Sequence, residues 1–334
     1  PTLTYQQRRH NLALLAEDLV DYPDLSPEAQ EALESRLVCD LFEGAAPYRP
    51  RYILPDYKKA LEQGSQFLEL EPPTDLDEAL NFLTILYNHV PSITSFPVYL
   101  GNIDRLLSPF ASDLTDQELY KKLKLFWRGI DRMLPDGFVH ANLGPADTRV
   151  GRMIFEIEQE LKQVVPNLTL KYDPKITPDD FLLRGIETVF KVGKPHFANH
   201  PMMVEDLGTE YAVVSCYNSL KVGGGAHNLV RLNLKQTVEE HQGDLESYLQ
   251  ESLPHYVGLT LEVMEARIRY LVEESSFFDS HFLVQEGLIN LDNFSAMFGI
   301  FGLAEAVNYL LEDEYKYGHD QEANRLAYQI TDTI

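Results

Sequence analysis

Apolar residues recur every three or four positions through much of the first half of the chain, which predicts amphipathic helices. This pattern covers residues 26–42, 55–70, 75–90, 113–134 and 147–165. Ser26 is the expected N-cap of the first helix, and Asp113 or Thr115 is that of the fourth. Residues 44–57 are rich in proline and arginine, so we expect an extended path there.

Alternation of apolar and polar positions begins further along the chain and predicts strands. The alternating or β-branched segments are residues 167–174, 210–217 and 228–235. Helical patterns return at residues 244–275, with breaks at Pro254 and Gly258, and at residues 297–315, entered through Gly299 and Gly302. Strands that alternate with long helices predict a single α/β domain with helices on the outside.

The end of the chain and its composition bound the class of protein. Residues 320–334 carry a helical pattern without a stop signal, so we expect the chain to be part of a longer protein. Hydrophobic residues make up 44% of the 334 residues, which is typical of a globular protein. The apolar runs are shorter than the roughly 18 residues of a membrane helix, and the N-terminus does not resemble a signal peptide.

Charge and cysteine content narrow the expected partners and compartment. The net charge is −24, from 52 acidic and 28 basic residues, which argues against a nucleic-acid surface and a polybasic membrane patch. Two distant cysteines, Cys39 and Cys216, provide neither a zinc ribbon nor a disulfide framework. We therefore expect a cytoplasmic protein without nucleic-acid or membrane partners, and the sequence leaves a homo-oligomer open.

Two motifs that suggest bound phosphate or metal fail on their details. The three glycines at 223–225 lack the third glycine of a dinucleotide fingerprint, because that position is Asn228. His196 and His200 have the spacing of a metal site, but prolines bracket them and no glutamate follows His196 as in zinc proteases. We expect no metal in this chain.

One cysteine, Cys216, lies where an apolar run passes into a polar, glycine-rich segment. A neighbouring imidazole lowers the pKa of a thiol, so Cys216 with His227 or His196 would suit a cysteine hydrolase. Labelling of Cys216 by iodoacetamide at neutral pH is the first requirement of that hypothesis. On residue type alone, a cysteine after Ala-Val-Val-Ser is more often a small buried hydrophobe.

Several segments, taken in order, resemble glycyl radical enzymes of the pyruvate formate-lyase kind. They are "GNIDRLLSPF" at 101–110, "PNLTLKY" at 166–172, "GKPHFANH" at 193–200 and "VVSCYNSL" at 213–220. Downstream, "GGGAHNLVRLNLK" at 223–235 and "FGIFGLAEAVNYL" at 298–310 are similar to anaerobic ribonucleotide reductases, with Asn233 at the family asparagine. The whole pattern, over about residues 40–312, looks most like the YjjI branch of the superfamily.

This resemblance implies a fold: a ten-stranded α/β barrel of two antiparallel half-sheets surrounded by helices. Residues 1–334 would form one barrel domain, mainly helical over about 1–165, with barrel strands and helices over about 166–334. Cys216 would lie on a finger loop at the barrel centre. The glycyl radical signature R-V-x-G-Y does not occur in the sequence, so we expect the radical in a C-terminal segment beyond this chain.

The resemblance also implies a function in anaerobic metabolism. Cys216 would form a thiyl radical and abstract hydrogen from a small polar substrate, after a radical S-adenosylmethionine activating enzyme has installed the glycyl radical. This chain would bind no cofactor itself and would be inactive alone. Substrate binding would fall to Asn233, His227, Asn199, Asn218 and His196, and Gly223, Gly224 and Gly225 would let the loop turn tightly.

Departures from the family pattern limit the reaction. Asn218 replaces the glutamate of Cys-x-Glu, which argues against diol dehydration, and Ser215 replaces the first cysteine of Cys-Cys, so acyl-transfer chemistry is not implied. A second class of function stays open, in which the barrel lost the radical and serves as a binding or regulatory scaffold. A longer reading frame with an R-V-x-G-Y-like motif would distinguish the two.

Overall fold

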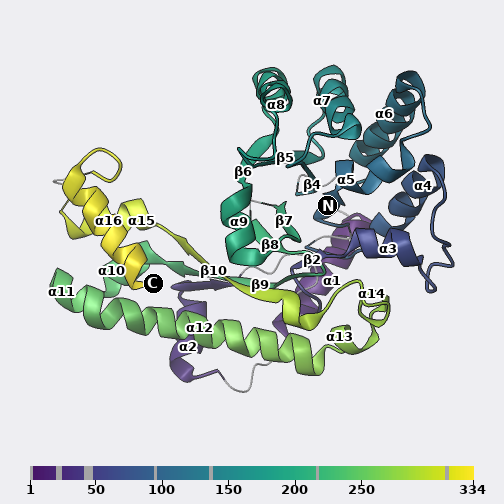
Figure 1. Cartoon of the computed structure of the whole chain (residues 1–334). Coiled ribbons are helices and arrows are strands. Elements are labelled where there is room, and N and C mark those ends of the chain that lie inside the picture. Colours follow the sequence, from purple (N-terminus) through teal and green to yellow (C-terminus); the bar gives the residue numbers. More distant parts are fainter. Residues whose placement is uncertain are drawn as a thin grey trace. The chain divides into compact units, whose positions relative to one another are not determined.

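The structure is a computed structural model that describes residues 3–19, 25–40, 48–93, 96–134, 138–215, 218–312 and 316–334. The chain forms two compact units, each built from separated segments (Figure 1). Unit 1 comprises residues 1–49, 227–276 and 296–334, and unit 2 comprises residues 50–226 and 277–295. The expected change of character near residue 165 falls inside unit 2, between a helix and a strand of its main sheet.

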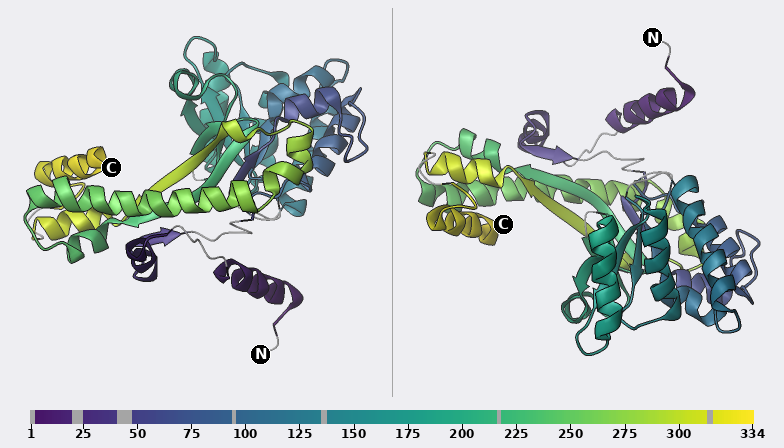
Figure 2. Two further views of the ribbon diagram at one scale, coloured as in Figure 1. Left: turned by 90° about the horizontal axis from the view of Figure 1, so that it is seen from below. Right: turned by 90° about the horizontal axis from the view of Figure 1, so that it is seen from above.

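The main sheet of unit 2 has four parallel strands. In spatial order they are β3 (Tyr99–Asn102), β4 (His140–Leu143), β5 (Asn167–Tyr172) and β6 (His196–Asn199). The connections contain α5 (Ile103–Leu107), the short 3₁₀ helix η1 (Ser108–Phe110), α6 (Asp116–Met133), α7 (Arg149–Leu161) and α8 (Asp179–Val192). Figure 2 shows α6, α7 and α8 side by side along this sheet.

These helices form where the sequence predicts them, for local reasons. Thr115 caps α6 in a reciprocal capping box with Glu118, and Thr148 caps α7 through the Gly151 amide. Leu168 and Leu170 of β5 are completely buried, and a side chain at Gly185 of α8 would press on Leu170. The helices predicted over 113–134 and 147–165 and the strand predicted over 167–174 are confirmed, apart from a few residues at their ends.

Further strands and helices complete unit 2. It contains β2 (Tyr52–Leu54), α3 (Tyr57–Gln63), α4 (Leu76–Tyr87), α9 (His200–Leu207), β7 (Tyr211–Val214), β8 (Asn218–Lys221), α13 (Phe277–Ser280), α14 (Phe282–Gln285) and the short 3₁₀ helix η4 (Leu291–Asn293). β7 and β8 form a two-stranded antiparallel sheet. α3 is shorter than the predicted helix over 55–70, because Gly64 has a left-handed φ of 78° and ends it.

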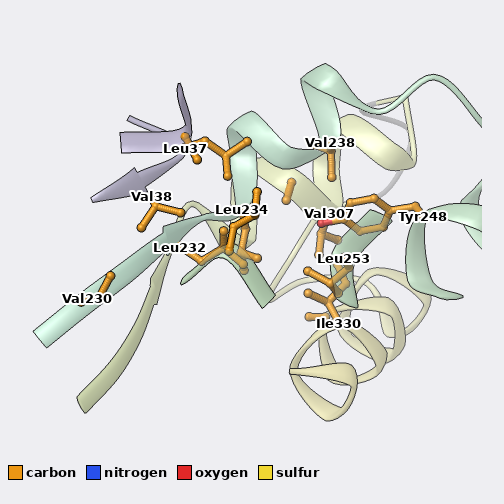
Figure 3. Close-up of a cluster of buried hydrophobic side chains, with 14 of the residues drawn as sticks. Leu37, Val38, Val230, Leu232, Leu234, Val238, Tyr248, Leu253, Val307 and Ile330 are labelled. Atoms are coloured by element: carbon orange, nitrogen blue, oxygen red, sulfur yellow. The ribbon is translucent and has the colours of Figure 1, made fainter. Parts of the chain in front are cut away.

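Unit 1 is built on β1 (Val38–Asp40), β9 (Gly224–Asn233) and β10 (Phe294–Phe301), in the order β1-β9-β10. β9 and β10 both begin in unit 2, where β2 pairs with the start of β9. The helices are α1 (Tyr5–Asp18), α2 (Pro27–Glu34), α10 (Leu234–Glu240), α11 (Leu245–Ser247), α12 (Leu253–Arg269), α15 (Leu303–Leu310), α16 (Gln321–Thr333) and the π-helical turns η2 (Tyr248–Ser252) and η3 (Tyr270–Glu274). Figure 3 shows their core, in which Leu232 of β9, Tyr248 and Val307 are buried together.

Three predictions for unit 1 were wrong. The helix predicted over 26–42 ends at Glu34, and the following residues form β1, in which Val38 pairs with Leu232. The segment from residue 297 begins as a strand, and its helix starts only after Gly302, whose φ of 77° turns the chain. α12 also runs through Gly258 without a break. In the first two cases strand pairing overrides the local helical pattern.

Among the described residues, no helix is long and apolar enough to span a membrane.

Candidate functional site

Position 216 falls in the chain between β7 and β8, which pair as a β-hairpin. The two strands are antiparallel, with Val214 opposite Asn218. Cys216 and Tyr217 lie outside the described residues. Ser215, which precedes them, is buried, has a φ of 48°, and its hydroxyl accepts a 2.9 Å hydrogen bond from the Tyr52 hydroxyl. A tertiary contact therefore fixes the chain immediately before Cys216.

Two side chains of the parallel sheet hold β7. The Asn142 amide donates to the Val213 carbonyl and accepts from the Val213 N–H, both at 2.9 Å, so it acts as a short strand partner. The Lys171 ammonium donates to the Tyr211 carbonyl at 2.6 Å and lies 4.1 Å from the centre of the Tyr211 ring. Because Tyr211 lies at Lys171 and Val213 at Asn142, β7 runs antiparallel to β4 and β5.

The face of the sheet that binds β7 is polar. Asn102, Asn142, Thr169 and His196 occupy matching positions of the four strands, and alternation puts every second residue on the same face. The polar residues of this face are Asn102, His140, Asn142, Asn167, Thr169, Lys171 and His196. The opposite face carries apolar residues such as Leu143 and Leu168, which are fully buried. A polar sheet face buried under a hairpin is a candidate site for a small polar molecule.

The histidines of this polar face are neutral at physiological pH. Burial, helped by the nearby His196 and Lys194, lowers the pKa of His140 to about 4. His140 Nε2 lies 3.2 Å from the Asn167 side-chain amide nitrogen. Burial and Lys194 also lower the pKa of His196. A neutral imidazole can accept or donate a hydrogen bond to a substrate without adding charge.

A buried carboxyl and a buried ammonium lie at the carboxyl end of the sheet. Asp104 accepts hydrogen bonds from the Gly144 amide at 3.0 Å and the Thr148 hydroxyl at 3.1 Å. Burial nevertheless raises its pKa to about 6. Burial, followed by repulsion from Arg105, lowers the pKa of Lys171 to about 8. The Asp104 carboxyl therefore takes up a proton, and the Lys171 ammonium loses one, at pH values closer to neutrality than in exposed residues of these types.

A cavity of about 250 Å³ opens next to Lys171. Its walls include Tyr57, Leu61, Tyr99, Asn102, Arg105, Leu106, Pro109, Phe110, Lys171, Glu210, Tyr211 and Val222. Glu210, Tyr211 and Val222 belong to the β7–β8 hairpin or flank it directly. The cavity thus borders the segment that leads to Cys216.

The structure places the predicted substrate-binding residues in different settings. His196 lies on the polar face, and Asn218 is the half-buried first residue of β8. Asn199 is exposed and caps α9 by accepting from the Met202 amide. Asn233 caps α10 in the same way through Gln236, so both asparagines have a structural role. Their part in substrate binding stays a prediction.

His227 lies on β9 at the start of unit 1, which also contains Asn233, whereas His196, Asn199 and Asn218 belong to unit 2. It is almost completely buried, and burial lowers its pKa to about 4. Pairing of Cys216 with His227 or His196 cannot be placed, since Cys216 lies outside the described residues. Within the described part of the chain, no group of three or more His, Cys, Asp or Glu side chains could hold a metal ion.

The predicted role of the glycine run is wrong for two of its members. Gly224 and Gly225 lie in β9 and not in the turn that contains Cys216. A Cβ at Gly225 would overlap the Tyr52 carbonyl of β2, and one at Gly224 would overlap the carbonyl of Asn293. Only Gly223, with a φ of 73°, serves a turn, the one between β8 and β9. Close backbone packing explains these glycines.

Comparison with known proteins decides the family. A family model described as "Glycyl radical enzyme YjjI-like" matches residues 3–334. The chain belongs to this family of YjjI-like glycyl radical enzymes. It is 50% identical over 336 residues to the Escherichia coli (strain K12) protein named "Uncharacterized protein YjjI", with 99% of this chain and 65% of that protein covered. The chain thus spans about two thirds of the length of this curated relative.

Solved structures agree with the family on the fold. An anaerobic ribonucleotide reductase from Thermotoga maritima, with citrate in its active site, matches with a TM-score of 0.72 at 17% identity, over 92% of this chain and 64% of that one. A glycyl radical enzyme from Archaeoglobus fulgidus matches with a TM-score of 0.54 at 13% identity, over 83% and 51% of the two chains. The expected α/β fold of the YjjI-like glycyl radical enzymes is confirmed.

The polar face itself was missed by sequence reasoning. Its signal is present in "HANL" and "NLTLKY", where His140, Asn142, Thr169 and Lys171 alternate with apolar residues. Such alternation normally indicates a strand with one solvent-exposed face. In this protein the polar positions are buried, which no local pattern reveals.

Proposed function

We propose that Cys216 of the full-length protein carries a thiyl radical that abstracts hydrogen from a small polar substrate. Membership of the glycyl radical enzyme family supports this proposal. The observation that carries it is the hairpin around position 216, which Asn142 and Lys171 hold on a buried polar face. Since β7 runs antiparallel to β4 and β5, it leads toward the end of the face where His140 and Asn167 lie.

The proposed reaction step is a reversible hydrogen-atom transfer. The Cys216 sulfur radical takes a hydrogen atom from a substrate C–H bond, which forms the S–H bond and leaves the unpaired electron on the substrate carbon. The product radical takes the hydrogen back, and the sulfur radical is restored. Buried surroundings suit this chemistry, because exclusion of water and other thiols prevents quenching of the radical.

The polar face would bind and orient the substrate. His140, Asn167 and His196 offer neutral hydrogen-bonding groups, and Asn218 would add an amide from the hairpin. His227 keeps the same proposed role on β9. Since Asn199 and Asn233 cap helices, we propose that they act on the substrate only through the loops that they brace.

A glycyl radical in the part of the full-length protein beyond this chain would supply the unpaired electron to Cys216. The chain suits such a donor, because its other cysteine, Cys39, lies in β1 of unit 1 and not in the hairpin. We propose a radical S-adenosylmethionine activase as the partner that installs the radical. A reducing, anaerobic cytoplasm would preserve both the thiols and the radical.

Electron paramagnetic resonance on the full-length protein tests this proposal without knowledge of the substrate. After anaerobic activation with the activase, we expect a doublet, because the unpaired electron couples to the α-hydrogen of the glycine. In D₂O the Cys216 thiol becomes S–D and returns deuterium to the glycine. The doublet of the wild type should therefore collapse toward a singlet, whereas Cys216→Ala should keep its doublet.

Cys39→Ala is the matched control, and its doublet should collapse in D₂O as in the wild type. If activation yields no glycyl signal, the protein is not a radical enzyme and the scaffold hypothesis replaces the proposal. If Cys216→Ala loses its doublet in D₂O as fast as the wild type, another group exchanges the hydrogen and Cys216 is not the relay.

A further inference from the structure

The cavity beside Lys171 is large enough for a small organic molecule. Its volume is about 250 Å³. A dry cavity of about 150 Å³ holds a benzene molecule, so this one can hold a ring with a short substituent. The side chains that give it an apolar body are Tyr57, Leu61, Tyr99, Leu106, Phe110 and Tyr211.

The buried end of the cavity is positively charged. Lys171 is only 2% exposed, and its described partners are the Tyr211 carbonyl at 2.6 Å and the Tyr211 ring at 4.1 Å. Neither partner carries a negative charge. Arg105 also lines the cavity, and its ion-pair partner Glu210 is 3.8 Å away, near the limit of such a contact. Two neighbouring cations thus face the cavity, and the carboxyl groups that attract them are Glu210 and the buried Asp104, whose pKa burial raises to about 6.

The carboxylates that line the cavity lie toward the solvent, and the buried Asp104, which attracts Lys171, is not part of its lining. Glu62 and Glu210 line the cavity with side chains that are 66% and 64% exposed. Asp56 uses its carboxylate to cap α3 through the Lys59 amide. Water screens exposed charges much more strongly than buried ones. A ligand that enters therefore meets an apolar wall and an ammonium group at the buried end, which favours an anion.

We propose that this cavity binds a small organic carboxylate with an apolar ring or chain, whose carboxylate contacts Lys171 and Arg105. The apolar body would pack on the tyrosine rings. This inference goes beyond the proposed function and does not depend on it, because binding needs no radical. Since Lys171 also holds the Tyr211 carbonyl, the bound carboxylate would contact the residue that fixes the start of β7.

The charge of Lys171 makes binding dependent on pH. The groups around it are Arg105 and Asp104 from the segment of α5, Glu210 and Tyr211 from the hairpin, and His200 from α9. The pKa of Lys171 lies near 8, so the ammonium is lost as the pH rises through that value. A bound carboxylate favours the charged form. Affinity should therefore be highest below pH 8 and fall above it.

Benzoate is the probe, with benzyl alcohol and benzylamine as matched compounds of the same size. Binding is measured by calorimetry and by ligand-observed NMR on the full-length, unactivated protein, so no radical chemistry contributes. We expect benzoate to bind at least about tenfold more tightly than benzyl alcohol, since one charged contact of about 1.4 kcal/mol corresponds to a factor of ten. Benzylamine should not bind measurably. The affinity for benzoate should fall as the pH rises from 7 to 9.

Three variants locate the site. Lys171→Met and Arg105→Met replace the charged side chain by an unbranched apolar one and should each weaken benzoate binding at least about tenfold. Lys175→Met removes the same charge from an exposed position that does not line the cavity, and should bind as the wild type does. Arg105 is half-exposed, so its variant remains informative if Lys171→Met fails to fold.

Four outcomes would overturn the inference. The first is that benzoate does not bind, and the second is that it binds Lys171→Met and Arg105→Met as tightly as the wild type. Benzyl alcohol binds as tightly as benzoate, which would make the cavity a purely apolar site. Benzylamine binds best, which would show that the exposed carboxylates determine selectivity. None of these outcomes affects the glycyl radical signal, so failure here is distinguishable from failure of the proposed function.

Discussion

The Asn142 side chain forms with Val213 the two hydrogen bonds that the backbone of a neighbouring strand would form. Its amide carries a donor and an acceptor on one carbon, as a peptide group does, and it satisfies both the N–H and the C=O of Val213. It is completely buried, so water cannot replace either hydrogen bond. The position of β7, and with it the hairpin around position 216, therefore depends on this buried amide together with Lys171.

We expect Asn142→Leu to destabilise the fold by about 2–4 kcal/mol, because two buried polar groups of Val213 lose their partners. The free energy of unfolding in urea measures this loss, and faster amide exchange at Val213 locates it. Asn88→Ala is the control: Asn88 is exposed and its side chain bonds only within its own helix, so its loss should cost less than about 0.5 kcal/mol. Equal losses in both variants would contradict this account.

His140 links the polar face to pH. Its pKa is about 4 in the folded protein, against 6.5 for an ordinary histidine. Between these values the unfolded chain binds a proton that the folded protein does not, so stability falls as the pH drops from 6.5 to 4. The expected loss is on the order of 2–3 kcal/mol, from about 1.4 kcal/mol per pKa unit.

Urea unfolding at pH 7, 5.5 and 4.5 measures this effect. His140→Asn should show a shallower decline than the wild type over that range, because the titrating group is gone. His89→Asn removes an exposed histidine and should follow the wild-type slope. Identical slopes for all three proteins would mean that His140 does not titrate below its ordinary value.

At the scale of elements, periodicity gave the long helices and tertiary pairing decided the rest. The helices around 116–133 and 149–161 have caps and one apolar face, so their sequences suffice. β4 and β6 have four residues each, with polar positions that alternate, and a short segment of this kind resembles a loop. The apolar run 294–301 suits a strand or a helix, and only its pairing with β9 makes it a strand.

Part of the candidate site, like part of the secondary structure, could be predicted from the sequence. The order of the motifs pointed to Cys216 and to the family, because each motif is a continuous segment that can be read from the sequence. The polar face could not be predicted, because it joins four strands and its burial depends on a hairpin that docks from a distant part of the chain. The contact of Asn142 with Val213 in particular has no local signal, since the two residues are 71 positions apart.

The pairing of β2 with β9 depends on a glycine. Gly225 lies opposite Ile53, and a Cβ there would overlap the Tyr52 carbonyl, which belongs to a paired strand and cannot move away easily. We expect Gly225→Ala to cost about 3 kcal/mol or to prevent folding. Gly258→Ala is the matched control, because Gly258 is exposed in α12 with no atom near its missing Cβ. It should gain up to about 1 kcal/mol from helix propensity.

Urea midpoints of the two alanine variants should therefore move in opposite directions. A stable Gly225→Ala protein with an unchanged midpoint would show that the β2–β9 backbones can separate at no cost, against the packing described above. A lower midpoint for Gly258→Ala would contradict the placement of residue 258 in a continuous helix.

At the scale of the whole molecule, the excess of negative charge affects the stability of the fold. The chain carries 52 acidic and 28 basic residues, so repulsion between carboxylates exceeds attraction between ion pairs. Several described ion pairs, such as Lys58 with Glu62 and Arg325 with Glu322, are exposed and contribute little each. Salt screens both the repulsion between carboxylates and the attraction within ion pairs, and the repulsion is the larger of the two.

We therefore expect the melting temperature to rise by a few degrees when NaCl increases from about 20 mM to about 300 mM, a range over which the screening length falls below roughly 10 Å. Differential scanning calorimetry measures the shift. KCl should give the same rise, because screening depends on ionic strength and not on the identity of the cation. A fall in melting temperature would mean that the ion pairs outweigh the repulsion of 24 excess negative charges. A rise with only one of the two salts would indicate a specific cation site, and screening would then not be its cause.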